Sequence, residues 1–526
     1  MYDFIVVGSG SAGSLIAGKL ARSGANVLVL EAGGADRSML IHMPAGFQKL
    51  LVKGRFQFPY ETVPQMQLDG RSRSLLVAKG VGGGSSLNAM CYVVGQPRDY
   101  DAWQAAVGET GNWSYADLLP YFRGNEANDM FSDTYHGVSG PVRVSQPPRI
   151  NPLNQAAVRA FQQAGLPYNA DYNGAKQLGV SPVQSTFYNA RRYSSAVAFL
   201  HPEEWRTNIT IETNAMVQRI IFDGDRAQSV EYVKGGKTYR ASAGEIVLSA
   251  GALNSPRILM LSGVGPEGDL KRHGIRVMHP ASEVGENLQD HAQVPIMAQC
   301  RYDWGYFRDA HGLRMLVNGL RYLLFRDGPA SGSGIESNAY FNPDDPSGDP
   351  TIQSFHNPAL LSESLGEAAG KPGITFVNVV LQPRSRGRMK LRDDDPRSMP
   401  LIDPNWFGDP EDMRKIIGGL RYIRNVMEQP ALKEVLLPEL APGIEARSDE
   451  ALSAYVRKAA TTMWHPVGTC RMGSDNDSVV DADLRVRGTR SLRVIDASIM
   501  PNIVSANTNA PTMALASKGV DLILGR

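Results

Sequence analysis

The stretch FIVVGSGSAGSLIAGKLARSGANVLVLE, from Phe4 to Glu31, contains a strand, a glycine turn, a helix and a second strand in immediate succession. Residues 4–7 are a short apolar run rich in β-branched side chains, which is typical of a parallel strand buried on both faces. Apolar residues at helical spacing follow from 15 to 20, Gly24 ends that pattern, and residues 27–30 form another apolar run. This order predicts an α/β fold built on a dinucleotide-binding sheet.

Three glycines, Gly8, Gly10 and Gly13, form a GxGxxG motif between the first strand and the helix. The first permits a tight turn, the second lets the backbone approach a pyrophosphate, and the third lets the helix pack close to the strand. Glu31 follows Gly13 by 18 residues, and we expect its carboxylate to hydrogen-bond a ribose hydroxyl. That charge disfavours the 2′-phosphate of NADP, but the motif fits NAD and FAD equally, because both carry an ADP half.

The composition restricts the class of protein and the number of domains. A chain of 526 residues exceeds the roughly 250–300 residues at which a single core usually stops growing, so two domains are expected. Lys and Arg total 54 against 53 for Asp and Glu, with no long run of either sign. A nucleic-acid binder would carry a basic excess, so we expect a small-molecule partner and no nucleic acid.

The cysteines and the hydropathy pattern bear on location. Cys91, Cys300 and Cys470 lie far apart, without a CxxC pair or a neighbouring histidine pair, so neither a disulfide framework nor a metal site is predicted. The N-terminus lacks a basic segment followed by an apolar one, and no stretch approaches the ~20 apolar residues needed to span a bilayer. We therefore expect a cytoplasmic protein without a membrane span.

Longer motifs distinguish FAD from NAD. Two stretches resemble the first and second signatures of the glucose-methanol-choline (GMC) oxidoreductases: AKGVGGGSSLNAMCYVVGQPRDYDAW at residues 78–103 and GALNSPRILMLSGVG at residues 251–265. The resemblance continues in the family's order through VGENLQDH (284–291), SRGRMKL (385–391), WHPVGTCRMG (464–473) and residues 493–516. It implies a discontinuous Rossmann-like FAD-binding domain and an α+β substrate domain with an antiparallel sheet.

The expected domain boundaries follow the positions of these motifs. The FAD-binding domain is predicted to comprise residues 1–149, 191–294 and 461–526, and the substrate-binding domain residues 150–190 and 295–460. Within the latter, residues 301–314 combine aromatic and charged side chains, and we interpret them as a mobile entrance loop.

The resemblance also implies the contacts to FAD, which come from segments throughout the chain. The predicted cofactor-binding residues are Gly8, Gly10, Ser11, Ala12, Gly13, Glu31, Ala32, Val81, Gly83, Asn88, Ala89, Met90, Val217, Asp496, Ala497, Pro511 and Thr512. The glycine loop at 82–86 lacks the GxxxxGK[ST] pattern of a P-loop, so it suits a flat ring or a diphosphate and not nucleotide hydrolysis. Leu87 occupies the position of the linking histidine in covalently flavinylated relatives, so FAD is expected to be non-covalent.

By the same resemblance, the catalytic pair is His465 and Asn509. Oxidising an alcohol removes a hydroxyl proton and a hydride; flavin N5 accepts the hydride, and the protein must take the proton. Histidine suits a general base because its unperturbed pKa is near 6.5, while a neutral amide can orient the alcohol oxygen. His291 is a tempting second base, which we interpret as structural or flavin-adjacent.

The expected activity is FAD-dependent oxidation of an alcohol to the aldehyde. Met463 and Trp464 beside the base favour an uncharged aryl or aliphatic primary alcohol, with O2 or another electron acceptor, so oxidase and dehydrogenase both stay open. Three alternatives remain: a non-redox relative such as a hydroxynitrile lyase, a choline-type dehydrogenase, and an NAD-dependent dehydrogenase. Serine hydrolases and zinc proteases are disfavoured, because GxSxG and HExxH are absent.

Overall fold

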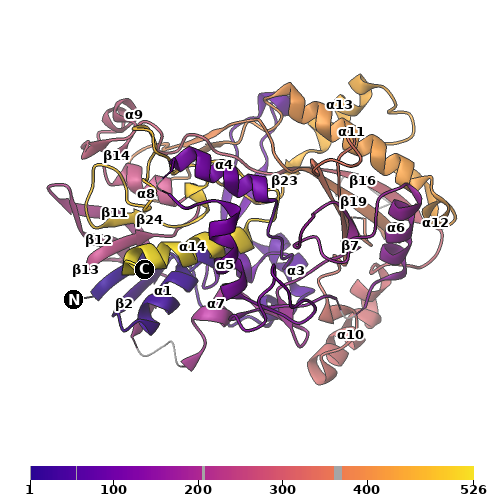
Figure 1. Ribbon diagram of the computed structural model, residues 1–526, viewed down its shortest axis with the longest axis horizontal. Coiled ribbons are helices and arrows are strands. Elements are labelled where there is room, and N and C mark those ends of the chain that lie inside the picture. The colour runs from indigo at the N-terminus through magenta and orange to yellow at the C-terminus, as the bar shows by residue number, and fades with distance from the viewer. Residues whose placement is uncertain (1, 55, 110, 148, 204–207, 361–369) are drawn as a thin grey trace.

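The computed structural model describes residues 2–54, 56–109, 111–147, 149–203, 208–360 and 370–526. Two large sheets lie at opposite ends of the molecule, the first towards the left of Figure 1 and the second towards the right. Helices pack around both.

The first sheet has the strand order β10-β2-β1-β13-β12-β11, with β24 also paired to β13. Its strands are β1 (Tyr2–Val7), β2 (Val27–Glu31), β10 (Ile209–Thr213), β11 (Met216–Asp223), β12 (Arg226–Lys234), β13 (Lys237–Leu248) and β24 (Leu492–Val494). The pairs β10/β2, β2/β1, β1/β13 and β13/β24 are parallel, whereas β11, β12 and β13 form an antiparallel meander. All five residues of β2 are buried, which explains its unbroken apolar run.

The helix predicted after the glycine motif is α1 (Ser11–Arg22), and it packs against α14 (Asn509–Leu524) from the far end of the sequence. Figure 1 shows yellow α14 lying beside indigo α1. Residues 510–520 of α14 are all buried, as expected for a helix that is apolar on every side. The packing brings two distant chain segments together beside the first sheet.

The second sheet has the order β22-β16-β19-β18-β17-β7, with β23 paired to β16, and all these pairs are antiparallel. Its strands are β7 (Gly179–Pro182), β16 (Ala292–Cys300), β17 (Ser337–Phe341), β18 (Ile352–Asn357), β19 (Gly373–Val380), β22 (Leu436–Ala441) and β23 (Thr461–Thr462). The helices that pack against its strands include α6 (Pro152–Gln163), α11 (Pro410–Met427), α12 (Pro430–Lys433) and α13 (Asp449–Ala459).

Shorter elements connect the two sheets. The helices are α2 (Met39–His42), α3 (Gly46–Lys53), α4 (Pro97–Val107), α5 (Tyr115–Asn125), α7 (Ser195–Phe199), α8 (Ser255–Leu261), α9 (Glu267–Arg272) and α10 (Gly312–Phe325). The 3-10 turns are η1 (Met66–Leu68), η2 (Gly83–Ser86), η4 (Arg308–Ala310), η5 (Pro329–Ser331) and η7 (Ala497–Ile499). The short strands are β3 (Gln57–Glu61), β4 (Ser74–Ala78), β5 (Glu126–Asn128), β6 (Val142–Val144), β8 (Phe187–Tyr188), β9 (Arg191–Arg192), β14 (Val264–Gly265), β15 (His279–Pro280), β20 (Arg388–Lys390) and β21 (Leu401–Asp403).

The predicted fold class is confirmed, because a Rossmann-like sheet and an antiparallel sheet are both present. The exact domain boundaries stay a proposal: β16 begins at Ala292, before the predicted boundary at 295, and β23 pairs with β16 from inside the segment assigned to the FAD-binding domain. Among the described helices, none has the length and apolar character needed to cross a bilayer.

Candidate active site

A cavity of about 1270 Å³ opens between residues of the two sheets. Strands β1, β2 and β11 contribute to one end of its lining, and β16, β18 and β19 contribute to the other. Its volume exceeds the roughly 300–1,000 Å³ of a typical small-molecule pocket. The cavity therefore has room for a large ligand against the first sheet and a small one beneath the second.

The end at the first sheet has the features of an anion site. Gly10, Ser11 and Ala12 line it at the start of α1, which has neither a side-chain cap nor an acidic residue in its first turn. Its first N–H groups and the positive end of its dipole therefore face the cavity, as required for binding a diphosphate. A Cβ on Gly83 would come within 2.5 Å of the Gly10 Cα, so the two glycine segments pack backbone against backbone.

Glu31 lies at the end of β2 and is nearly buried. Its Oε2 accepts hydrogen bonds from the Ser9 N–H (3.0 Å) and the Ser9 hydroxyl (2.7 Å), and its Oε1 accepts one from the Gly33 N–H (2.8 Å). A carboxylate offers about four acceptor positions, so one remains for a ribose hydroxyl. The donor and acceptor set at this end thus fits the ADP half of a dinucleotide.

Most of the predicted cofactor residues line the cavity. They are Gly8, Gly10, Ser11, Ala12, Glu31, Ala32, Gly83, Asn88, Ala89, Val217, Asp496, Ala497 and Thr512. Gly13, Val81, Met90 and Pro511 lie behind this lining. Gly13 has a packing role instead, because a Cβ there would come within 2.0 Å of the Gly8 carbonyl oxygen.

His465 is held in a hydrogen-bonded chain that sets its tautomer. The Nε2 of His291 lies 2.9 Å from the Leu381 carbonyl oxygen, which can only accept, so this nitrogen carries the proton. The Nδ1 of a neutral His291 is then an acceptor, and the Nδ1 of His465, 2.9 Å away, must donate to it. The lone pair of His465 is consequently on Nε2.

Both rings are neutral at physiological pH. Burial lowers the pKa of His291 to about 4, partly opposed by its bond to Leu381. Burial lowers the pKa of His465 well below its usual range, and the electrostatic effect of the neighbouring His291 lowers it further. His465 lines the cavity, and its unprotonated Nε2 is the nitrogen that is not bound to His291, so it can act as a base towards a ligand there.

The backbone around His465 is held by Asp290, the residue before His291. Its Oδ1 accepts from the His465 N–H (2.8 Å), and its Oδ2 accepts from the Thr462 hydroxyl (2.6 Å). Burial raises the pKa of Asp290 to about 7, partly offset by these hydrogen bonds. Trp464, between these contacts, has the left-handed φ of +58°. The sequence reasoning missed Asp290, although the DH pair in NLQDH is a recognisable signal.

The amide beside His465 belongs to Asn507 and not to Asn509. The Asn507 Nδ2 lies 3.3 Å from the His465 Nε2, whereas the Asn509 Oδ1 accepts a 2.6 Å hydrogen bond from the Ser11 hydroxyl. Asn509 is the first residue of α14, so its side chain is turned towards α1. Both asparagines line the cavity, but the pairing expected from the sequence is replaced by His465 with Asn507.

Above the base, the second sheet presents two rows of side chains to the cavity. Pro295, Val377 and Phe355 are register partners across β16, β19 and β18, and the next row is Met297, Thr375 and Asn357. Alternate residues of a strand face the same side, so these six form one surface. Its four apolar members, one hydroxyl and one amide form a largely uncharged ceiling.

The carboxylates among the described lining residues are Glu31 and Asp496, and both belong to the first domain's end of the cavity. The Asp496 Oδ2 accepts hydrogen bonds from the Gly251 N–H (2.8 Å) and the Ser255 hydroxyl (2.5 Å). These bonds hold the carboxylate against the segment that follows β13. The ceiling thus offers no counter-ion to a cationic ligand.

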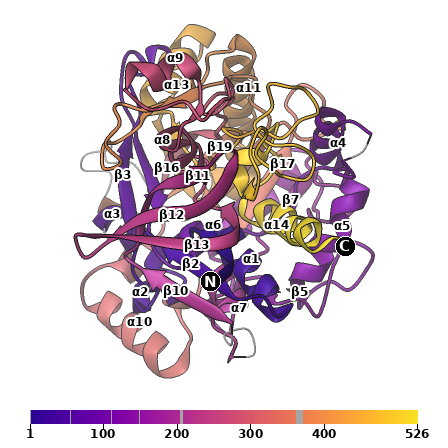
Figure 2. The same cartoon turned by 90° about the vertical axis from the view of Figure 1, so that its left-hand side faces the viewer.

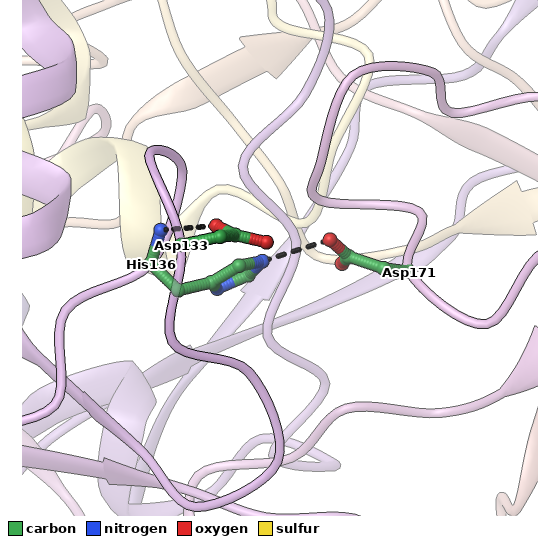
Figure 3. A group of neighbouring side chains, drawn as sticks. All are labelled: Asp133, His136 and Asp171. Carbon is green, nitrogen blue, oxygen red and sulfur yellow. Dashed lines mark hydrogen bonds and ion pairs between the residues drawn. The ribbon is translucent and has the colours of Figure 1, made fainter.

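A separate group of titratable side chains surrounds His136 outside the cavity (Figure 3). Its Nε2 lies 2.9 Å from an Asp171 oxygen, and its Nδ1 lies 3.1 Å from a Glu126 oxygen. Burial opposes the charged form, but hydrogen bonds to Asp171 and Glu126 prevail and raise the pKa of His136 to about 10. The ring is therefore an imidazolium with no lone pair for a metal, although Asp133 also lies nearby.

Known proteins resemble the chain along its whole length. The family model described as GMC oxidoreductase matches residues 2–293 with its N-terminal part and residues 383–516 with its C-terminal part. An alcohol dehydrogenase [acceptor] of Pseudomonas putida is 39% identical, over 100% of this chain and 96% of the relative. An oxygen-dependent choline dehydrogenase of Paraburkholderia xenovorans is also 39% identical, over 100% and 94%.

Solved structures agree with these sequence matches. The crystal structure of pyridoxine 4-oxidase from Mesorbium loti superposes with a TM-score of 0.91 at 30% identity, covering 100% of both chains. That of a formate oxidase superposes with a TM-score of 0.92 at 26% identity, covering 100% of this chain and 98% of the other.

Proposed function

The chain belongs to the GMC oxidoreductase family, and on this premise we propose that it oxidises an uncharged primary alcohol, aryl or aliphatic, to the aldehyde. As a member, it is an FAD-dependent oxidoreductase acting on CH–OH donors. The observation that carries the proposal is the His465 Nε2 lone pair, which faces the cavity beneath an uncharged ceiling.

The residues described above would hold FAD without a covalent link. The start of α1 would bind the diphosphate, Glu31 the ribose, and Asn88 with Ala89 the ring system. When bound, FAD supplies the acceptor for the two electrons of the alcohol. Leu87 also lines the cavity, and a hydrocarbon side chain has no atom that can bond to the flavin, which supports dissociable binding.

The chain's own contribution is the proton transfer. The His465 Nε2 takes the hydroxyl proton, while the Asn507 amide, which cannot ionise, holds the alcohol oxygen beside it. A positioned general base contributes typically ~10²- to 10⁴-fold, or about 3–5 kcal/mol. His291 acts as a positioning residue, because it keeps the proton of His465 on the nitrogen that faces away from the substrate.

The uncharged substrate class is supported by the lining. A quaternary ammonium group requires a carboxylate or an aromatic cage when it leaves water. Phe355 is the one aromatic residue of the six-residue ceiling, Trp464 lies beside the base, and the described residues of the ceiling include no carboxylate, so the ceiling offers neither an aromatic cage nor a counter-ion. Choline oxidation remains the second candidate, since choline dehydrogenases are 39% identical to this chain.

We propose a cytoplasmic location, supported by Cys91, Cys300 and Cys470, which are all buried free thiols. The electron acceptor is O2 or another oxidant. A hydroxynitrile lyase activity would differ from alcohol oxidation with any acceptor, because it predicts no change in the oxidation state of FAD.

The test is an anaerobic panel of benzylic, furanic, aliphatic, polyol and quaternary-ammonium alcohols, scored by bleaching of the flavin absorbance. Uncharged primary alcohols should bleach it and choline should not. Bleaching by choline alone would transfer the assignment to the choline class, and no bleaching by any alcohol would favour the lyase. Admission of air to the reduced enzyme then identifies oxygen as acceptor or excludes it.

A further inference from the structure

Helix α10 projects from the body of the protein with a leucine-rich face exposed. It is set apart from both sheets at the lower right of Figure 1 and the lower left of Figure 2. The exposed apolar side chains are Leu313, Leu316, Val317, Leu320, Leu324, Leu323 and Phe325, each between 50% and 76% exposed. The first five recur at helical spacing and so form one stripe along the helix.

This stripe faces away from the protein. In the described part of the chain, the helix has one buried side chain, Tyr322, whose hydroxyl donates to the Ala190 carbonyl (3.0 Å). Asn318 donates to Asp309 (3.2 Å), and the Lys49 ammonium lies 3.6 Å from the Met315 sulfur. An apolar stripe of this size normally packs against a core, and its exposure marks an interaction site.

The charges on α10 identify the partner. Arg314 and Arg321 lie on the helix, Arg326 follows it, and residues 312–326 include no acidic side chain. Arg321 pairs with Asp327, but within the described residues neither Arg314 nor Arg326 forms an ion pair. An apolar stripe bordered by arginines is typical of helices that lie in the surface of a membrane with anionic lipids.

A second copy of the chain fits this surface less well. A helix of 14 residues is about 21 Å long and roughly 10 Å wide, far short of the ~800 Å² that each partner usually buries in a stable complex. In a two-fold contact the same arginines would also approach their symmetry mates. A convex, basic and isolated stripe suits a fluid lipid surface.

We propose that α10 docks the protein on the surface of an anionic lipid bilayer, with its axis in the membrane plane and its leucine stripe inserted. The helix is too short to span the ~30 Å hydrocarbon core. Lys49 connects α10 to α3, whose Phe47 and Gln48 line the cavity, so the docked face lies next to a wall of the active site. The proposal does not depend on which alcohol is oxidised.

The test is flotation of the FAD-loaded enzyme with vesicles of phosphatidylcholine alone or mixed with phosphatidylglycerol. We expect the wild type to float with the mixed vesicles. The Leu316→Glu/Leu320→Glu variant should lose at least ~100-fold in partition, because each buried leucine contributes more than tenfold. Arg314→Gln should lose about fivefold on the mixed vesicles and little on phosphatidylcholine alone.

The matched control is Met66→Glu, which changes a side chain that is 76% exposed on η1, outside α10. It should float like the wild type, and equal loss in both variants would overturn the proposal. All variants are compared for flavin absorbance and for anaerobic alcohol reduction without vesicles. A dimer in light scattering that Leu316→Glu/Leu320→Glu dissociates, without any vesicle binding, would assign the stripe to a second copy.

A second measurement remains valid if the glutamate variant fails to fold. The three native cysteines are buried, so a polarity-sensitive fluorophore can be attached selectively at Val317→Cys or at Met66→Cys. The probe at 317 should shift to the blue on phosphatidylglycerol-containing vesicles, and the probe at 66 should not. No shift at 317 would contradict the docking.

Discussion

At the scale of single residues, the proton position on His465 is set by a main-chain carbonyl, that of Leu381, which is not part of the cavity lining. Leu381 fixes the proton on the His291 Nε2, so the His291 Nδ1 accepts a hydrogen bond from the His465 Nδ1–H. His291→Phe keeps the ring volume but removes the acceptor, and we expect kcat to fall by about tenfold or more, since tautomer control is part of general-base catalysis. His291→Asn, which offers an oxygen near the former Nδ1, should recover much of the loss.

The two asparagines give a second residue-level prediction. Asn507→Ala should lower kcat by about 10²-fold with FAD retained, because it removes the amide beside the base. Asn509→Ala should instead weaken FAD retention, because it removes the acceptor of the Ser11 hydroxyl at the start of α1. Turnover with saturating FAD and flavin content after gel filtration separate the two effects. The opposite assignment of effects would restore the pairing expected from the sequence.

The pH dependence follows from the lowered pKa values of His465 and His291. Each ring is neutral above its folded-state pKa, so the base form persists as pH falls through 6.5. The kcat/KM for an alcohol should therefore stay level from pH 8 to pH 6.5 and decline only at lower pH. A half-loss near pH 6.5 would mean that His465 titrates like an exposed histidine, and it would contradict the lowered pKa.

At the scale of elements, the ceiling formed by β16, β18 and β19 should set which alcohols fit. Phe355→Ala removes a ring from the Pro295 row, so kcat/KM for benzylic alcohols should fall about tenfold or more while bulkier alcohols gain. Val294→Ala alters the opposite face of the same sheet, because Val294 alternates with the lining residues Gln293 and Pro295, and it should leave the order of preference unchanged. A parallel shift in both variants would show that the sheet acts only through stability.

Elements differ in how far the sequence predicts them. The β1-α1-β2 unit is predictable because GxGxxG stands between a strand and a helix, where each glycine has a steric reason. The sequence of helix α10 would fit a helix whose apolar stripe packs on a core equally well. Only its place in the fold shows that the stripe faces outward. Residues 301–314 were expected to form an entrance loop, but none of them lines the cavity, and α10 begins within that stretch.

The choice between Asn507 and Asn509 had no local signal either. The stretch ANTNAPT places them two residues apart, and which one faces His465 depends on where α14 begins. The cap residue Thr508 makes no side-chain hydrogen bond that would mark that start.

At the scale of the whole molecule, the triad of Glu126, His136 and Asp171 connects β5 to the loop that carries Asp171. The pKa of His136 is raised from 6.5 to about 10, so its contribution to stability is fully present below pH 6.5 and is lost as pH rises through 10. His136→Gln should cost about 3–5 kcal/mol near pH 6.5, and the gap in thermal unfolding midpoint from the wild type should close towards pH 10. The exposed His311→Gln is the control, and a gap that does not vary with pH would refute the triad's role.

The hydrogen bond between Ser11 and Asn509 joins residues 498 positions apart, at the place where the diphosphate would bind. On the ribosome, Ser11 is made early. Its hydrogen bond to Asn509 cannot form until Asn509 has been synthesised and has left the exit tunnel. We therefore expect FAD to be retained best after Asn509 has been made, because a nascent chain halted at an earlier codon carries the whole glycine signature without this bond at the diphosphate site.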